Sequence, residues 1–240
     1  MDDKIQGFVL QNIRYGESSL VVRMYTLNNG LQSYIVKGVR GKSSHNRVAL
    51  FQPMTFLSFV QQGKPQGGLA YLKDVELAYV YQSIPFVMNK SAILIYLSEL
   101  LSHTLTQQER NDELYGFISQ SVRWLDLVES GYANFPLYFT LELSRFLGFY
   151  PQGNYQPQAF FDMMEGQFVM TQPVHPYYFE KEESAVLSRL LNCGIDNLSS
   201  VNMTGTQRNA VLDGVLTFMR LHAPVLKGLQ SHEVLKEVLR

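Results

Sequence analysis

Cysteine is almost absent from this sequence: Cys193 is the one cysteine among 240 residues. We therefore expect neither an intramolecular disulfide nor a metal site built from clustered cysteines. The five histidines, at positions 45, 103, 175, 222 and 232, are too scattered to indicate a ligand set. Cys193 lies among apolar residues next to a predicted helix end, which is typical of a buried thiol rather than a nucleophile.

The sequence also lacks the motifs of common catalytic centres. It has no phosphate-binding G-x-x-x-x-G-K-[ST] loop, no G-x-S-x-G nucleophile turn and no H-E-x-x-H zinc helix. The glutamates at 180, 182 and 183 open a predicted helix, where the helix dipole favours negative charge. We therefore expect a protein that is not an enzyme and that needs no metal and no cofactor.

No long hydrophobic run is present. The longest candidate, residues 92–101, contains Ser98 and Glu99 and is shorter than the ~20 apolar residues of a membrane helix. The first residues, Met1 to Lys4, lack the charged and then apolar layout of a secretory signal. With 46% hydrophobic and 17% charged residues, the composition indicates a folded protein of the cytoplasm.

Acidic residues are missing between Glu17 and Asp74. Within this window four cations fall inside eleven residues, namely Lys37, Arg40, Lys42 and Arg47. Glycines and serines between them predict a flexible loop. A cationic loop between apolar strands suits binding of a phosphate backbone, because Lys and Arg neutralise phosphates without reading bases. The alternative is a solvated loop whose cations serve solubility.

The net charge of −1 hides an asymmetry along the chain. Residues 1–80 contain nine Lys and Arg against five Asp and Glu, whereas the remainder contains eleven against sixteen. A basic N-terminal part followed by an acidic remainder favours a module for polyanions attached to a part with another role.

The N-terminal part reads as five short strands, since apolar residues alternate and turn residues separate the runs. The predicted strands are 5–11, 20–26, 31–36, 55–60 and 69–80. Asn28, Asn29 and Gly30 predict a hairpin turn between the second and third. Five strands in about 75 residues predict a small closed barrel, for which the OB-fold is the common form that binds single strands.

Several aromatic residues lie among the basic residues of this part. We expect Phe51 and Phe56 in the core, because their neighbours are apolar. Tyr15 and Tyr34 are expected at the surface, where rings stack on unpaired bases. The predicted nucleic-acid site comprises the four loop cations, these two tyrosines, and Arg14 and Arg23 from neighbouring strands.

After Pro85 the hydrophobic pattern becomes helical. Helices are predicted over 86–105, 113–128, 135–149, 180–192, 206–222 and 232–239. The third is apolar almost all round and is predicted to be the central buried helix. Residues 151–176 form an irregular excursion with a possible hairpin, 159–163 and 167–170. The fold class is therefore α+β, with an OB-fold domain over 1–80 and a helical domain over 81–240.

Spaced letters in the first 60 residues resemble the N-terminal pattern of the RecO family. They are GFVL at 7–10, YGESS at 15–19, GL at 30–31, VKGVR at 36–40 and LFQP at 50–53. Residues 226–235 and the helix 134–149 also resemble segments of that family. Many of its members hold a zinc ion through four cysteines in the region of 151–176. This chain has none there, so the resemblance implies no metal site.

The resemblance implies a non-enzymatic mediator of recombinational DNA repair with an OB-fold. Such a protein binds single- and double-stranded DNA and anneals complementary strands. It acts at the nucleoid with RecR, contacts single-stranded-DNA-binding protein, and thereby helps RecA onto DNA. From the residues alone, an RNA-binding or translation-associated OB protein remains an alternative.

The resemblance also implies a site in the helical part for the acidic C-terminal tail of single-stranded-DNA-binding protein. Such a ligand needs an apolar groove with a cation beside it. The candidate residues are Leu137, Tyr138, Leu141, Arg145 and Arg123. The alternative is that this helix is simply core.

Overall fold

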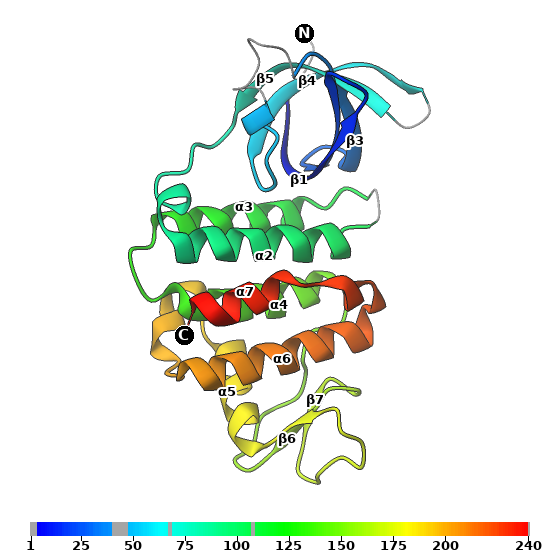
Figure 1. The fold of residues 1–240 in the computed structure, drawn as a ribbon. Helices are drawn as coiled ribbons and strands as arrows, with labels where there is room; N and C mark the ends of the chain where they lie inside the picture. The colour runs from blue at the N-terminus through cyan, green and yellow to red at the C-terminus, as the bar shows by residue number, and fades with distance from the viewer. Residues whose placement is uncertain (1–3, 40–47, 67–68, 107–108, 240) are drawn as a thin grey trace. The chain divides into compact units, whose positions relative to one another are not determined.

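The computed structural model describes residues 4–39, 48–66, 69–106 and 109–239. The chain forms two compact units (Figure 1). Unit 1 contains Met1–Pro85 and Leu97–Val122, and unit 2 contains Phe86–Tyr96 and Arg123–Arg240. Helices α2 (Met88–Thr104) and α3 (Asp112–Leu127) therefore contribute residues to both units. The division into domains 1–80 and 81–240 stays a prediction.

Unit 1 is built on a closed five-stranded barrel with the order β1-β2-β3-β5-β4, which confirms the predicted barrel. Its strands are β1 (Ile5–Tyr15), β2 (Ser19–Thr26), β3 (Gly30–Val36), β4 (Phe56–Gln66) and β5 (Leu69–Leu77). Four pairings are antiparallel, and the β3–β5 pairing is parallel. A mixed five-stranded barrel of this order is an OB-fold.

The interior of the barrel follows the two-residue period of its strands. On β2, Leu20, Val22 and Met24 face inward and pack with residues of the other strands, whereas the odd-numbered residues face outward. β1 continues to Tyr15, beyond its predicted end at residue 11. A bulge between Val9 and Gln11 shifts the register, after which pairing with β2 continues to Tyr15.

Helical residues of unit 1 cover one end of the outer barrel face. The ring of Phe8 on β1 stacks on Tyr115 of α3 with centroids 5.8 Å apart, and it also contacts Phe56 at 5.5 Å. Ser102 of α2 donates a hydrogen bond to the carbonyl of Leu10 at 3.2 Å. Phe56 is buried, as predicted, but it lies on the outer face of the barrel together with Phe8 and not in the interior. Phe51 is buried in the barrel interior.

Unit 2 contains the first turns of α2, the end of α3 and four further helices. These are α4 (Phe135–Phe146), α5 (Lys181–Asn192), α6 (Gly205–His222) and α7 (Ser231–Val238). Their bounds agree with the predicted helices to within a few residues. No helix in the described residues combines the length and apolar character that crossing a membrane requires.

Helix α4 is the buried centre of unit 2, as its apolar sequence predicts. Phe135, Phe139 and Leu143 are fully buried. The two buried polar residues of α4 have partners within the unit. The hydroxyl of Thr140 donates to the carbonyl of Pro136 at 2.7 Å and pairs with the hydroxyl of Tyr96 at 2.6 Å, and the hydroxyl of Ser144 donates to the carbonyl of Leu141 at 2.6 Å. Buried polar groups with partners do not weaken a core.

The excursion after α4 folds into a three-stranded sheet with the order β7-β6-β8. The predicted hairpin is present as β6 (Phe160–Asp162) and β7 (Gln167–Val169), and the third strand, β8 (Tyr178–Phe179), was not predicted. The ring of Phe161 is buried. Its centroid lies 5.2 Å from the ring centroid of Phe168, 6.3 Å from that of Phe179 and 5.6 Å from that of Phe218 of α6. Packed aromatic rings therefore hold this sheet on α6.

Gly214 of α6 marks how closely β8 approaches that helix. A methyl group there would lie 2.0 Å from the ring of Phe179, so either the ring or the strand must move. We expect Gly214→Ala to lower the free energy of unfolding by about 1–3 kcal/mol, the usual cost of overpacking. Gly116 of α3 is the matched control, because a methyl group there meets no atom within 4 Å.

Gly116→Ala should stabilise the protein by roughly 0.5–1 kcal/mol, since alanine is the better helix former. Thermal and urea unfolding of both variants measures the difference. Equal effects of the two substitutions would contradict the close approach of β8 to α6.

Candidate nucleic-acid interface

Of the four predicted loop cations, only Lys37 lies within the described residues; Arg40, Lys42 and Arg47 lie outside them. Lys37 follows the last residue of β3 and is exposed. Its ammonium nitrogen lies 4.5 Å from the centroid of the Tyr71 ring of β5. A cation at this distance over a ring face is attracted to it, which orients the lysine side chain along the barrel surface.

Arg14 and Tyr15 lie at the same end of the barrel as Lys37. The register pairs Arg14 with Leu20 and Leu20 with Val36, which precedes Lys37. Both residues are exposed, and 57% of Tyr15 is accessible to solvent. This end of the barrel therefore presents two described cations and two tyrosines from three strands.

The prediction of a surface position for Tyr34 is wrong. Only 1% of Tyr34 is exposed, and its ring meets Phe59 edge-on in the barrel interior with centroids 5.1 Å apart. Burial raises the pKa of its hydroxyl to about 12. The reason is register: Tyr34 pairs with the inward-facing Val22, and adjacent residues on a strand point to opposite faces.

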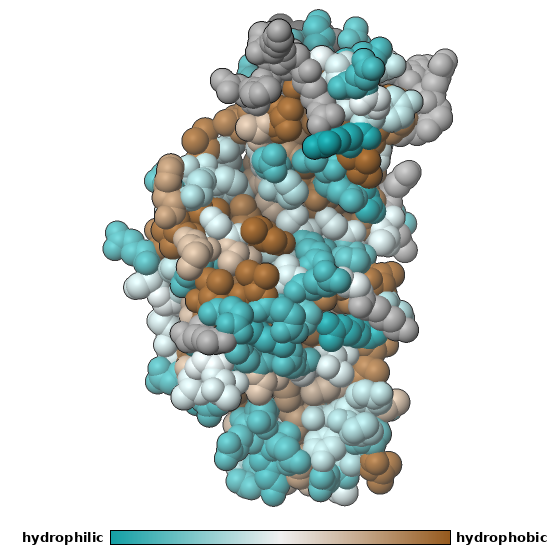
Figure 2. Space-filling view, in the orientation of Figure 1, coloured by the Kyte–Doolittle hydropathy of each residue, from teal (hydrophilic) through white to brown (hydrophobic). Residues whose placement is uncertain are grey.

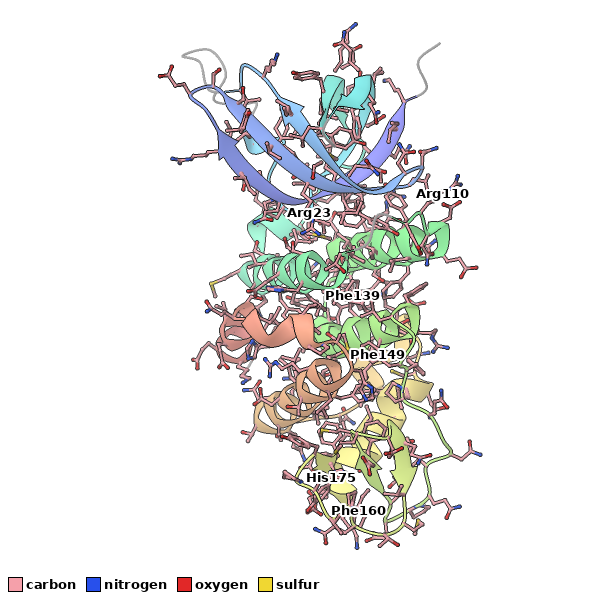
Figure 3. The ribbon with its side chains drawn as sticks, turned by 90° about the vertical axis from the view of Figure 1, so that its right-hand side faces the viewer. Arg23, Arg110, Phe139, Phe149, Phe160 and His175 are labelled. Atoms are coloured by element: carbon pink, nitrogen blue, oxygen red, sulfur yellow. The ribbon has the colours of Figure 1, made fainter. Side chains whose placement is uncertain are left out.

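Arg23 supports the fold of unit 1 (Figure 3). Its guanidinium donates a hydrogen bond to the carbonyl of Leu105, just beyond the end of α2, at 2.9 Å. A cation is favourable there because the last carbonyls of a helix carry partial negative charge. Arg23 also lies three residues along β2 from Leu20, which pairs with Arg14. It is therefore separated from the end of the barrel that carries Arg14 and Lys37.

Comparison with known proteins decides the family. Residues 1–81 match the family described as Recombination protein O N terminal, and residues 86–228 match Recombination protein O C terminal. The chain belongs to the RecO family. The DNA repair protein RecO of Phocaeicola vulgatus is 32% identical over 239 residues, and that of Flavobacterium psychrophilum is 34% identical over 240. Each alignment covers 99% of both chains.

Membership in the RecO family makes this chain a DNA repair and recombination protein with an N-terminal barrel and a helical C-terminal part. The family consists of recombination mediators rather than enzymes, in agreement with the prediction that the chain is not an enzyme. The sequence analysis also predicted a second site, for an acidic tail, among residues of the helical part.

The residues predicted to bind an acidic tail are not gathered into one groove. Leu137 and Leu141 are buried in the core, and Tyr138 is half-buried. Arg145 is exposed, but it pairs with Glu142 at 3.2 Å and its guanidinium carbon lies 3.9 Å from the Tyr150 ring centroid. Arg123 of α3 is exposed. The core alternative therefore holds for the two leucines.

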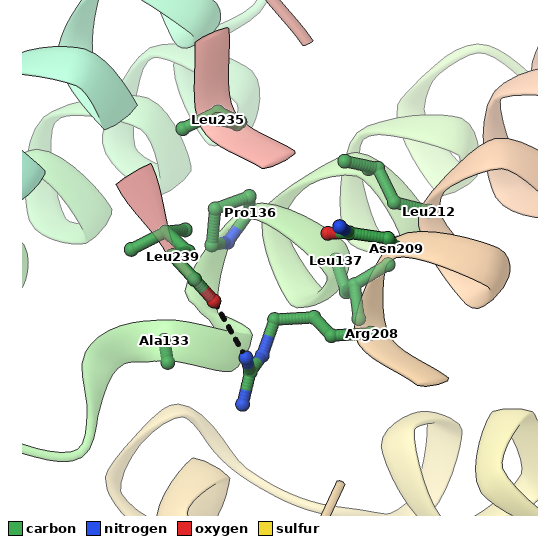
Figure 4. A pocket seen from close by; sticks show the side chains of 8 residues that line it. All are labelled: Ala133, Pro136, Leu137, Arg208, Asn209, Leu212, Leu235 and Leu239. Carbon is green, nitrogen blue, oxygen red and sulfur yellow. Dashed lines mark hydrogen bonds between the residues drawn. The ribbon is translucent and has the colours of Figure 1, made fainter. Parts of the chain in front are cut away.

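A different arginine, Arg208 of α6, lies beside Leu137 (Figure 4). It donates to Asn134 Oδ1 at 2.9 Å, to the carbonyl of Leu239 at 2.8 Å and, at 3.4 Å, to the carbonyl of Met203. Burial lowers its pKa, although not enough to remove the charge. Among the described residues, no carboxylate pairs with it.

Arg208 separates two hollows of unequal size. On one side is an apolar slot of about 10 Å³, lined by residues of α4, α6 and α7 that include Leu137, Leu212 and Leu235. On the other is an open polar hollow of about 300 Å³, which Asn89, Gly131 and Tyr132 help to line. The slot is too small for a side chain, so an incoming carboxylate would reach Arg208 from the open hollow.

The region of the small sheet, where the family resemblance had raised the question of a zinc site, contains a histidine and an aspartate. His175 Nε2 lies 3.2 Å from Asp162 Oδ2, and the other carboxylate oxygen of Asp162 accepts from the amides of Met164 and Glu165. Asp162 is the last residue of β6, and His175 is labelled beside the three-stranded sheet in Figure 3. In the described residues, no three His, Cys, Asp or Glu side chains converge on one point.

Proposed function

We propose that this RecO family member binds single- and double-stranded DNA through the Lys37 and Arg14 end of its barrel and promotes annealing of complementary strands. In this role it works with RecR in the bacterial cytoplasm, at the nucleoid during repair. It helps RecA to load onto DNA that is covered by single-stranded-DNA-binding protein.

The observation that carries the DNA-binding proposal is the cationic barrel end on a RecO family OB-fold. Lys37 and Arg14 are exposed there, and Tyr15 and Tyr71 offer rings next to them. Cations on such a surface attract the backbone whatever its sequence, while rings tolerate every base. Annealing needs no more than screened phosphates and accessible bases, so no catalytic centre is required.

The double variant Lys37→Glu/Arg14→Glu tests the site. We expect its affinity for single- and double-stranded DNA to fall roughly tenfold or more at low salt, for all sequences alike. The dependence of log Kd on log salt should flatten by about 0.7–0.9 for each cation lost. Fluorescence anisotropy with labelled oligonucleotides from 50 to 200 mM salt measures both quantities.

Lys4→Glu is the matched control. Lys4 is also an exposed barrel cation, but it is paired with Glu76 at 2.7 Å, so its loss should leave DNA affinity nearly unchanged. An unchanged affinity and salt slope in the double variant would place the DNA site elsewhere. Tighter binding of RNA than of DNA of the same sequence would favour the alternative role in RNA binding.

We also propose that the acidic tail of single-stranded-DNA-binding protein docks in the open hollow at Arg208. The support is a half-buried guanidinium with carbonyl and amide partners, open to a polar hollow on one side and next to apolar side chains on the other. A tail carboxylate would give this charge the partner that burial makes favourable.

A further inference from the structure

We infer that Tyr71 is a stacking platform for an unpaired base, at the end of an apolar row across the outer barrel face. This inference rests on the proposed DNA binding and assigns to it a residue absent from the predicted site. It concerns single-stranded DNA, because a base within a duplex offers no free face to a ring.

The register defines the row. Ile13 of β1 pairs with Val21 of β2, Val21 pairs with Ile35 of β3, and Ile35 pairs with Tyr71 of β5. Directly paired residues point to the same face of a sheet, and here it is the outer face, opposite Leu20 and Val22. We call Ile13, Val21, Ile35 and Tyr71 the outer row.

The outer row is accessible to solvent, whereas another part of the same face is covered. Ile13 is 53% exposed and Tyr71 is 40% exposed, while Val21 and Ile35 between them are half-buried. Further along the same strands, the outer-face residues Phe8 and Tyr25 are buried: Phe8 packs on Tyr115 of α3, and the hydroxyl of Tyr25 donates to the carbonyl of Glu109, which precedes α3. The outer row is therefore an accessible apolar strip that spans four neighbouring strands.

The charge at the end of the strip argues for a nucleic acid as its occupant. Lys37 lies over the Tyr71 ring, so a base that stacks on the accessible part of this ring has its phosphate close to the ammonium group. At the other end of the row, Tyr15 follows Ile13 on the same face of β1, and the exposed Arg14 lies between them at the rim of the barrel. Alternating rings and cations suit a single strand, whose bases stack while its phosphates pair with the cations.

Removal of the ring should separate stacking from charge. We expect Tyr71→Ala and Tyr71→Leu to bind single-stranded DNA about 5- to 150-fold more weakly, which corresponds to about 1–3 kcal/mol per stacked base. Their affinity for blunt duplex should change less than twofold. The salt slope should stay as in the wild type, because no cation is lost.

Two matched variants complete the design. Tyr71→Phe keeps the ring and should bind like the wild type. Tyr177→Ala removes a tyrosine of similar exposure, 42%, from unit 2 and should have no effect on DNA. Thermal melting of each variant checks that the barrel is folded, and Tyr71→Leu keeps an apolar side chain on β5 if alanine destabilises it.

The possible results separate this inference from the DNA-binding proposal. Normal single-strand binding by folded Tyr71→Leu overturns the inference, and the DNA site stands if Lys37→Glu/Arg14→Glu still weakens binding. Equal losses on single strands and duplex, with a flatter salt slope, also overturn it, because Tyr71 would then act only by placing Lys37. Normal DNA binding combined with lost binding to purified RecR overturns it in favour of a protein occupant.

Discussion

Phe161→Ala should unfold the three-stranded sheet of unit 2 at a temperature roughly 10 °C below the wild type. Phe161 is fully buried at the centre of β6 and contacts three other phenylalanine rings, two from the sheet and one from α6. Replacement of a buried phenylalanine by alanine costs about 3–5 kcal/mol, since it removes apolar burial and leaves a cavity. In a chain of this size, each kcal/mol lowers Tm by about 2–4 °C.

The controls for this prediction address exposure and metal. Phe86→Ala removes a phenylalanine that is 81% exposed and should change Tm by less than about 1 °C. A strong chelator should leave the Tm of the wild type unchanged, because packed rings rather than metal ligands hold the sheet in this account. Scanning calorimetry measures all three, and stoichiometric zinc in the purified protein would contradict the account.

The barrel was predictable because its signals are local. Asn28, Asn29 and Gly30 mark one turn, and the alternation on β2 marks one buried face. The helices were predictable for the same reason, and the apolar run 135–149 identified the central one. The third strand of the small sheet, β8, was missed because two residues contain no periodicity and their partner on β6 is remote in sequence.

The face to which each aromatic residue points was not predictable from the sequence. The run Leu31–Val36 is apolar at both odd and even positions near its end, so the pattern does not say whether Tyr34 or Ile35 faces the interior. Helical residues of unit 1 also bury part of the outer barrel face, which makes outward positions apolar too. Tyr34 was therefore placed wrongly, and Tyr71 was left out of the predicted site.

Arginines posed a related problem, since their partners lie far away in sequence. Arg23 binds the carbonyl of Leu105, 82 residues later, and Arg208 binds Asn134, 74 residues earlier. A sequence shows that an arginine is charged, but it does not show which carbonyl or carboxylate group accepts hydrogen bonds from it. The predicted cation for the tail site, Arg145, is paired with a glutamate of its own helix, three residues earlier.

Loss of Arg208 should abolish the proposed tail binding. We expect Arg208→Glu to weaken binding of a short acidic peptide with a terminal apolar residue by at least about 30-fold, because loss of one partner of a desolvated charge pair costs about 2–5 kcal/mol. Arg208→Lys keeps the charge but not the forked donor geometry, so intermediate affinity is expected. Isothermal titration with purified protein and synthetic peptide measures each Kd.

Arg208 also supports the fold, because α7 and Asn134 depend on its hydrogen bonds, so the decisive comparison changes the ligand instead. Amidation of the peptide's C-terminus removes the terminal carboxylate without touching the protein, and it should weaken binding about tenfold or more.

Arg145→Glu is the matched control on α4, where Glu142 already pairs with the arginine, and should bind the peptide normally. Hydrophilic side chains gather over the front of α7 (Figure 2), although Val234 of this helix is 52% exposed. Equal affinity of the free and amidated peptides would show that Arg208 does not receive the terminal carboxylate. Lost binding in Arg145→Glu alone would return the site to the sequence-predicted arginine.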